Sequence, residues 1–272
     1  MSIKKEIDRA VKLTAALNGN TTPKTPAEQD QIVLTVEEAV RNSAFNFNNA
    51  TSAVLSQDGK KRLVKRYTDL YSPEHILCQC IKQILDRTFK VRYPNRNKIS
   101  HDLFATLTAT IQMADFTIIK FDFKDYFNSI SSIYVFEKYL RSNLTDRHEI
   151  DLIKAFVYST KRSYAGLCTS NALAEIIATH FDKAIRKKFS SNGVIYYERY
   201  IDDCVLVLNE HMEESETKDL LNAVLLEVFH DTSLKCLQCK TEFNWKKFGY
   251  ISRRKVLSQK CSIDFLGYEF WF

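Results

Sequence analysis

Three aspartates have the residue type and the spacing that metal-dependent chemistry needs. Asp122 ends the apolar and β-branched run 116–123, and Asp202 and Asp203 lie between two apolar runs 80 residues later. Adjacent carboxylates repel each other, so a cation would stabilise them. Three carboxylates on neighbouring strands could hold two Mg²⁺ ions about 4 Å apart, an arrangement that supports nucleotidyl transfer. The alternative is that Asp-Asp is ordinary turn chemistry.

The elements that would position these acids follow from the hydrophobic periodicity. Residues 116–123 are typical of a buried strand, and 194–208 of a hairpin with the acids at its tip. The pattern predicts a loop or linker over 41–59, two helices over 60–89 divided at Ser72-Pro73, and short strands near 234–243 and 263–270. Helical spacing recurs at 4–18, 27–40, 101–113, 133–158, 171–189 and 215–230. The order of elements predicts an α+β fold.

Composition excludes several protein classes. The 272 residues are 45% hydrophobic and 26% charged, which is enough apolar surface for a core and excludes wholesale disorder. No apolar run approaches the roughly 18 residues of a membrane span. Seven cysteines without framework spacing indicate reduced thiols, so we predict a cytoplasmic protein.

The net charge of +6 is unevenly distributed. Residues 60–98 contain eleven Lys or Arg against three acids, and residues 240–260 contain seven against one. Two basic segments around a more acidic middle favour a protein that binds a polyanion at its edges and metal ions at its centre. The alternative is a pair of solvated helix faces.

Five short motifs follow one another in a characteristic order: Phe-Asp-Phe-Lys-Asp-Tyr-Phe-Asn-Ser-Ile (121–130), Gly-Leu-Cys-Thr-Ser-Asn (166–171), Tyr-Ile-Asp-Asp (200–203), Lys-Thr-Glu-Phe (240–243) and Phe-Leu-Gly-Tyr (265–268). The series resembles palm motifs A to E of reverse transcriptases. Its wording is most similar to the bacterial retron and abortive-infection, or defence-associated, enzymes. The resemblance covers about residues 60–272.

This resemblance implies a right-hand polymerase fold, with fingers over 60–115 and an antiparallel palm sheet backed by helices over 116–272, including a helical segment at 133–160. Residues 1–59 would be a helical N-terminal extension, with a possible role in oligomerisation. Because the chain stops directly after the fifth motif, the resemblance also predicts that the helical thumb is missing.

The resemblance assigns the metal ligands as the carboxylates of Asp122, Asp202 and Asp203 and the backbone carbonyl of Phe123. Two Mg²⁺ ions, for which Mn²⁺ could substitute, would neutralise the triphosphate and activate a 3′-hydroxyl. Lys240 matches the motif D lysine and would protonate the leaving pyrophosphate, with a surface salt bridge as its alternative role.

Other matched positions would contact the nucleotide or the primer. Phe127 matches the aromatic that excludes a ribose 2′-hydroxyl, with core packing as its alternative. Gly166 matches the motif B glycine that lets backbone approach the nucleotide. The glutamine usual before that glycine is Ala165 here and the usual proline is Asn171, so template contacts at this motif are open.

Three basic residues of the fingers, Arg92, Arg96 and Lys98, match positions that reach the triphosphate, with a solvated loop as the alternative. The primer grip would consist of Phe265, Leu266, Gly267 and Tyr268, although the same sequence also suits a core strand.

The implied function is an RNA-directed DNA polymerase that adds dNTPs to a 3′-hydroxyl, in bacterial antiphage defence. Its partners would be an RNA template, which could be a noncoding RNA, the DNA product, and a partner protein or a second copy of the chain, with no membrane. The alternatives are protein-primed or untemplated synthesis by the same site, and a non-catalytic nucleic-acid-binding subunit of a larger complex.

Overall fold

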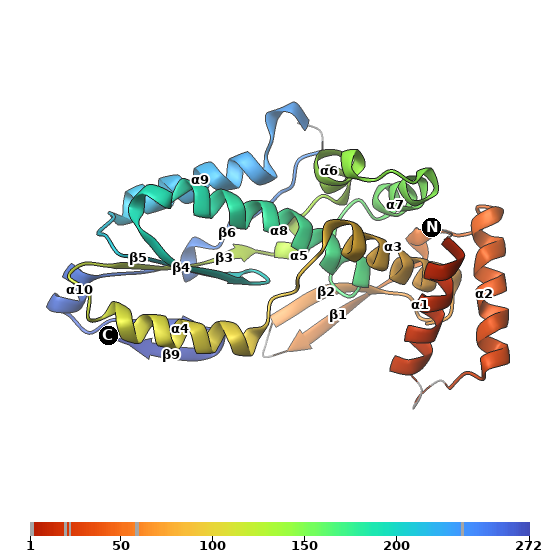
Figure 1. Cartoon of the computed structure of the whole chain (residues 1–272), viewed down its shortest axis with the longest axis horizontal. Coiled ribbons are helices and arrows are strands. Elements are labelled where there is room, and N and C mark those ends of the chain that lie inside the picture. Colours follow the sequence, from red (N-terminus) through yellow and green to blue (C-terminus); the bar gives the residue numbers. More distant parts are fainter. Residues whose placement is uncertain (1–2, 19–20, 22, 58–59, 235–236) are drawn as a thin grey trace. The chain divides into compact units, whose positions relative to one another are not determined.

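The computed structural model describes residues 3–18, 21, 23–57, 60–234 and 237–272 (Figure 1). The chain divides into two compact units. The first consists of Met1–Val91 and Ile130–Ile176, and the second of Arg92–Ser129 and Ile177–Phe272. No helix of the described residues is both long enough and apolar enough to cross a membrane. Six cysteines of the described residues, among them Cys78, Cys204 and Cys261, form no disulfide.

The first unit begins with two helices that confirm the periodicity. Helix α1 (Ile3–Leu17) packs against α2 (Pro26–Arg41) and against α3 (Pro73–Phe89). Two of these helices begin at side-chain caps: Thr25 forms a capping box with Glu28, and Ser72 caps α3 just before a proline at the first helical position. Helix α1 packs on α3, and both belong to the first compact unit. The division into an N-terminal extension, fingers and palm with boundaries at 59 and 115 stays a prediction.

The segment between α2 and α3 differs from the prediction. A single 3₁₀ turn, η1 (Phe47–Asn49), leads into a hairpin of β1 (Thr51–Gln57) and β2 (Lys60–Arg66). The predictions of a loop over 41–59 and of a helix over the first part of 60–89 were therefore wrong. In the hairpin Val54 is 61% and Leu63 41% exposed, whereas Val64 is buried, so neighbouring apolar residues do not show the alternation with polar residues that identifies a strand.

The remainder of the first unit is helical but interrupted. Instead of one helix over 133–158, the chain forms α6 (Ser132–Val135), a π-helical turn η2 (Phe136–Leu140), a 3₁₀ turn η3 (Arg141–Asn143) and α7 (Arg147–Thr160). The interruption has a local cause, because the Asp146 carboxylate accepts hydrogen bonds from two backbone N–H groups at the start of α7. Helix α8 (Cys168–Lys188) then leads into the second unit.

The second unit is built on an antiparallel sheet. The strands β4 (Val194–Tyr200), β5 (Asp203–Leu208) and β3 (Thr117–Lys124) lie in that order, and two short strands, β6 (Glu242–Phe243) and β7 (Gly249–Ser252), share the other edge of β3. This confirms the strand at 116–123, the hairpin at 194–208 and a fold that mixes helices with a sheet. Of the region 234–243, only β6 is strand among the described residues.

Helices cover both faces of this sheet (Figure 1). On one face, Phe121 and Phe123 of β3 contact Phe181 of α8, and Phe123 also contacts Phe229 of α9 (Glu214–Phe229). On the other face, Ile118 of β3 packs in a buried cluster with residues of α4 (Arg96–Thr110), β5, β7 and β8 (Ser262–Phe265). Successive side chains of β3 point to opposite faces of the sheet, and residues on both faces are buried.

The chain continues beyond the sheet with α10 (Arg253–Ser258) and a terminal hairpin of β8 and β9 (Tyr268–Trp271). The hairpin agrees with the predicted strand near 263–270. Both turn residues, Leu266 and Gly267, have positive φ of 52° and 81°, as a tight two-residue hairpin turn requires. β7 and α10 were not predicted, because elements of four and six residues carry too little periodicity.

Candidate active site

The second unit brings the three aspartates to one end of its central strands. Asp122 and Asp203 are direct partners in the β3–β5 ladder, and the backbone N–H of Phe123 donates to the carbonyl of Asp202 at 3.3 Å. Asp122 is only 1% exposed, and its Oδ1 has no hydrogen-bond partner. A buried carboxylate oxygen without a partner is costly, so this position is suited to receive a cation.

Asp202 and Asp203 depend on a strained turn. Ile201, at the tip of the β4–β5 hairpin, has φ of +59°, a region in which β-branched residues are rare. Its carbonyl accepts a hydrogen bond of 2.9 Å from Nη1 of Arg199. The guanidinium of Arg199 is itself fixed by the carboxylate of Asp182 on α8, with Nε–Oδ1 at 3.0 Å and Nη2–Oδ2 at 3.1 Å. This Arg199–Asp182 clamp holds the turn in the conformation that presents the two acids.

Burial and mutual repulsion act on the acids of the turn. Burial, and then the neighbouring charge of Asp203, raise the pKa of Asp202. Burial also raises the pKa of Asp203, while Lys120 lowers it and Asp122 raises it. The site therefore carries excess negative charge that is partly shielded from water. A cation would stabilise the charged carboxylates.

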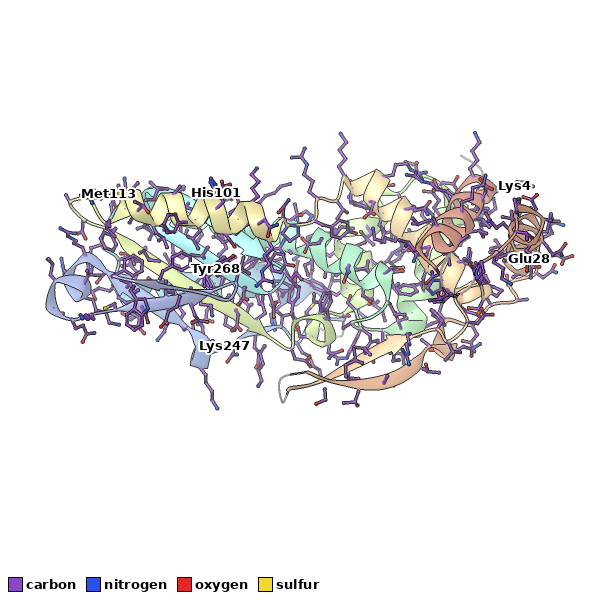
Figure 2. All side chains as sticks on the ribbon, turned by 90° about the horizontal axis from the view of Figure 1, so that it is seen from below. Lys4, Glu28, His101, Met113, Lys247 and Tyr268 are labelled. Atoms are coloured by element: carbon purple, nitrogen blue, oxygen red, sulfur yellow. The ribbon has the colours of Figure 1, made fainter. Side chains whose placement is uncertain are left out.

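Two lysines supply positive charge at the site. The Lys247 ammonium forms an ion pair with Oδ2 of Asp122, and this contact raises the pKa of Lys247. The Lys120 ammonium, from within β3, lies 4.0 Å from Oδ1 of Asp203 and 3.4 Å from Oδ2 of Asp264 on β8. Figure 2 labels Lys247 on the turn between β6 and β7.

The kinds of donor atom at the site indicate which metal ions it could bind. In the chain as described, with its gaps at 1–2, 19–20, 22, 58–59 and 235–236, no three His, Cys, Asp or Glu side chains form a group arranged to hold a metal ion. The aspartates contribute hard oxygen donors, and Oδ1 of Asp122 is unpartnered. The residues present therefore fit Mg²⁺ in the type of their donor atoms, and Oδ2 of Asp122 is bound by the Lys247 ammonium.

Phe127 lies in a short helix directly after β3. Helix α5 (Tyr126–Ser129) begins after Asp125, which has φ of +46° and accepts a hydrogen bond of 2.7 Å from the amide of Asn128. The side chain of Phe127 is only partly buried and its ring contacts Tyr126, with centroids 5.6 Å apart. Phe127 is thus not one of the fully buried core aromatics, unlike Phe121 and Phe123.

Lys240 and the lysines of the site occupy different positions. The backbone N–H of Lys240 donates to the carbonyl of Ser129 at 2.7 Å, and its side chain is exposed. The ammonium groups that contact the aspartates belong to Lys247 and Lys120, which sequence reasoning missed, as it missed the Arg199–Asp182 clamp. One signal was available for Lys120: a charged residue inside an apolar strand, two residues before Asp122.

The predicted nucleotide and primer residues of the second unit partly come together. Nη2 of Arg96 donates to the carbonyl of Leu266 at 2.7 Å, and a Cβ on Gly267 would lie 3.2 Å from the same guanidinium nitrogen. Arg92, in the segment before α4, and Lys98, in the first turn of α4, are both exposed. In the hairpin, Phe265 and Leu266 are buried in the cluster under α4. Tyr268, which is labelled in Figure 2, is 58% exposed.

Gly166 belongs to the first unit and is constrained there. Its φ is +95°, and an added Cβ would lie 2.5 Å from the carbonyl oxygen of Lys65. The adjacent Ala165 accepts a hydrogen bond of 2.8 Å from the backbone N–H of Lys65. Glycine is therefore required at this position by the β1–β2 hairpin itself.

Comparisons with known proteins identify a family and a similar fold. The family described as "Reverse transcriptase (RNA-dependent DNA polymerase)" matches residues 58–270. Among solved structures, telomerase from Candida albicans in complex with a fragment of telomeric RNA is similar with a TM-score of 0.51 and 13% identity, over 86% of this chain and 47% of that chain. The telomerase from Candida tropicalis is similar with a TM-score of 0.49 and 12% identity, over 89% and 47%. The chain thus spans about half the length of these structures. No curated protein matches the sequence.

Proposed function

The chain belongs to the reverse transcriptase family, and from this premise we propose that it is an RNA-directed DNA polymerase with Asp122, Asp202 and Asp203 at its active centre. The observation that supports the proposal is the ladder pairing of Asp122 with Asp203 on adjacent strands, together with an oxygen of Asp122 that has no partner. Two divalent ions, when bound, would lower the charge on the triphosphate and on the attacking oxygen.

The chain's own residues would position this chemistry. The backbones of Asp122 and Asp203 are held by the β3–β5 ladder, and the turn that carries Asp202 is held by the Arg199–Asp182 clamp. The carbonyl of Phe123 would complete one ion's ligands. Lys240 would donate a proton to the pyrophosphate as it leaves.

The remaining assignments concern the substrates. Phe127, partly exposed beside the end of β3, would exclude the 2′-hydroxyl of a ribonucleotide. Gly166, Arg92, Arg96 and Lys98 would contact the incoming dNTP, and the hairpin 265–268, with Tyr268 exposed, would support the primer. An RNA template is in keeping with the family description and with the RNA bound by the similar telomerase. A bacterial retron or defence type, with a role against phage, is part of this proposal.

The test is dNTP incorporation on a primed RNA template with Mg²⁺. The double substitution Asp202→Asn with Asp203→Asn should lower incorporation by at least about a hundredfold, because it removes charge that is needed in the transition state. RNA binding should be unchanged. Asp219→Asn, an exposed acid on α9, is the matched control and should retain full incorporation. Wild-type incorporation by the double variant would refute the proposal.

A second candidate is a non-catalytic nucleic-acid-binding subunit. The observation that favours it is the ammonium of Lys247 on Asp122, where a metal ion would have to bind. In this case the wild-type chain would bind RNA without incorporating any dNTP. Untemplated or protein-primed synthesis would instead give incorporation that does not depend on the added template.

A further inference from the structure

Between β6 and β7 the chain forms a short segment that is not paired with β3 as a strand and lies opposite Asp122. β6 pairs with β3 at Phe123, and β7 pairs with β3 at Lys120, so the five residues 244–248 face only two residues of β3. The segment contains the 3₁₀ turn η6 (Trp245–Lys247) and is attached at its start, where the backbone N–H of Asn244 donates to the carbonyl of Asp122 at 2.9 Å. The register of two strands on β3 therefore fixes which side chain reaches Asp122.

The turn η6 is held by the packing of Trp245, whereas the side chain of Lys247 is partly exposed to solvent. The ring of Trp245 packs between Phe243 and Phe248, with centroid distances of 5.3 and 5.4 Å. The side chain of Lys247 remains 49% exposed, although its ammonium contacts a carboxylate that is 1% exposed. Lys247 can consequently swing away into solvent without moving the backbone of the turn.

The two lysines of the site differ in this respect. The Lys120 side chain is 4% exposed and lies between Asp203 and Asp264, so it is a fixed cation. The Lys247 side chain reaches the site from its rim. A buried carboxylate without a counter-ion is strongly unfavourable, so the chain gains stability from an ammonium at Asp122 while no other cation is bound.

We propose that Lys247 is a built-in counter-ion that occupies the cation position at Asp122 and competes with divalent metal for it. The inference rests on the proposed function in one respect, the role of Asp122 as a metal ligand. Oδ1 of Asp122 is open to an incoming ion, and Oδ2 becomes available when Lys247 withdraws. The lysine thereby keeps the metal-free site stable and sets a threshold for metal binding.

The test measures Mn²⁺ binding without nucleotide or template, from the electron paramagnetic resonance signal of free Mn²⁺. Lys247→Met should bind Mn²⁺ about five- to tenfold more tightly than wild type, because a partly exposed ion pair no longer competes. Lys246→Met, on the same turn, removes a neighbouring exposed charge and should change affinity less than twofold. Equal or weaker affinity in Lys247→Met would overturn the inference.

Thermal unfolding gives a second readout that needs no activity. In EDTA, Lys247→Met should unfold at a lower temperature than wild type, and saturating Mn²⁺ should raise its unfolding temperature by more than it raises that of wild type. A Mn²⁺-induced rise no larger than that of wild type would also overturn the inference. Lys247→Gln, which removes the charge but keeps a polar end group, provides the same comparison if the methionine variant does not fold.

Asp122→Asn separates the two possible failures. If this variant binds Mn²⁺ as wild type does, Asp122 is not a ligand, and both the proposed function and the inference fail. If it loses binding while Lys247→Met matches wild type, the metal site stands and only the role of Lys247 is refuted.

Discussion

Asp122 and the Asp202–Asp203 pair meet at the same end of the sheet but are held there by different means. Asp122 lies within β3, between β5 on one side and the β6–β7 edge on the other, and it is 1% exposed. Asp202 and Asp203 lie at the tip of a hairpin, where Ile201 has positive φ and Arg199 holds its carbonyl.

This difference separates two ways of preorganising a site. The position of Asp122 follows from the hydrophobic core under β3, so it should fail only when that core fails. The position of the pair depends on a polar clamp and a strained residue, so it should be perturbed at little cost to the rest of the unit. Substitutions in the core under β3 should therefore mainly lower stability, and substitutions in the clamp should mainly lower activity.

The largest expected loss of stability comes from a substitution in the core under β3. Phe123 contacts Tyr126, Phe181, Phe229 and Phe243 with ring centroids between 5.1 and 5.6 Å, and is 2% exposed. Phe123→Ala should lower the free energy of unfolding by about 4 kcal/mol, because it removes buried surface and leaves a cavity. Urea unfolding measures this loss.

Phe104→Ala is the control for that substitution. Phe104 lies on α4 and is 65% exposed, so its removal should change the free energy of unfolding by less than about 0.5 kcal/mol. A similar loss in both variants would mean that the aromatic cluster around Phe123 does not anchor β3.

The next largest effect on stability comes from substitutions in the Arg199–Asp182 clamp. Arg199→Met should cost about 2 kcal/mol, because it leaves the carboxylate of Asp182, which is 27% exposed, without its cation. Arg199→Lys retains the charge but not the planar fork that also reaches Ile201, so it should keep most of the stability and lower dNTP incorporation about tenfold. Full incorporation by the lysine variant would show that the clamp does not position the acids.

The core side of the site was largely predictable from the sequence, because β3 and β5 bury continuous apolar runs such as Ile118–Ile119 and Leu206–Leu208. The three aspartates could be placed for the same reason, since each one lies near one end of such a run. The β1–β2 hairpin could not be predicted, because its strands leave Val54 and Leu63 exposed and bury no regular face.

Lys247 could not be predicted from the sequence, for a different reason. Lys247 reaches Asp122 only because β6 and β7 pair with β3 in registers that leave 244–248 opposite two residues. Such registers depend on long-range pairing that local patterns do not encode. Lys240, which the family resemblance indicated, is exposed, and where its side chain acts stays a prediction.

A smaller effect should appear in the pH dependence of stability in EDTA. Because burial and Asp203 raise the pKa of Asp202 above its ordinary value, the folded state binds this proton more tightly than the unfolded state. Stability of the wild type should therefore fall as pH rises from about 4 through the folded pKa. Asp202→Asn removes this term, so at pH 7 it should be as stable as wild type or more stable, by about 1 kcal/mol or less. A less stable variant at pH 7 would contradict the assigned repulsion.

The smallest effect concerns the strain at the tip of the hairpin. Ile201 has φ of +59°, which asparagine tolerates better than a β-branched residue and glycine adopts at no steric cost. Ile201→Gly should leave the free energy of unfolding nearly unchanged, because relief of strain is offset by the greater entropy of the unfolded chain. Ile201→Asn avoids most of that entropy and should gain about 0.5–1 kcal/mol in urea unfolding. If both variants lose more than about 1 kcal/mol, packing of the Ile201 side chain outweighs its strain, and the hairpin tip is held by hydrophobic contact, as β3 is, and not by the Arg199–Asp182 clamp alone.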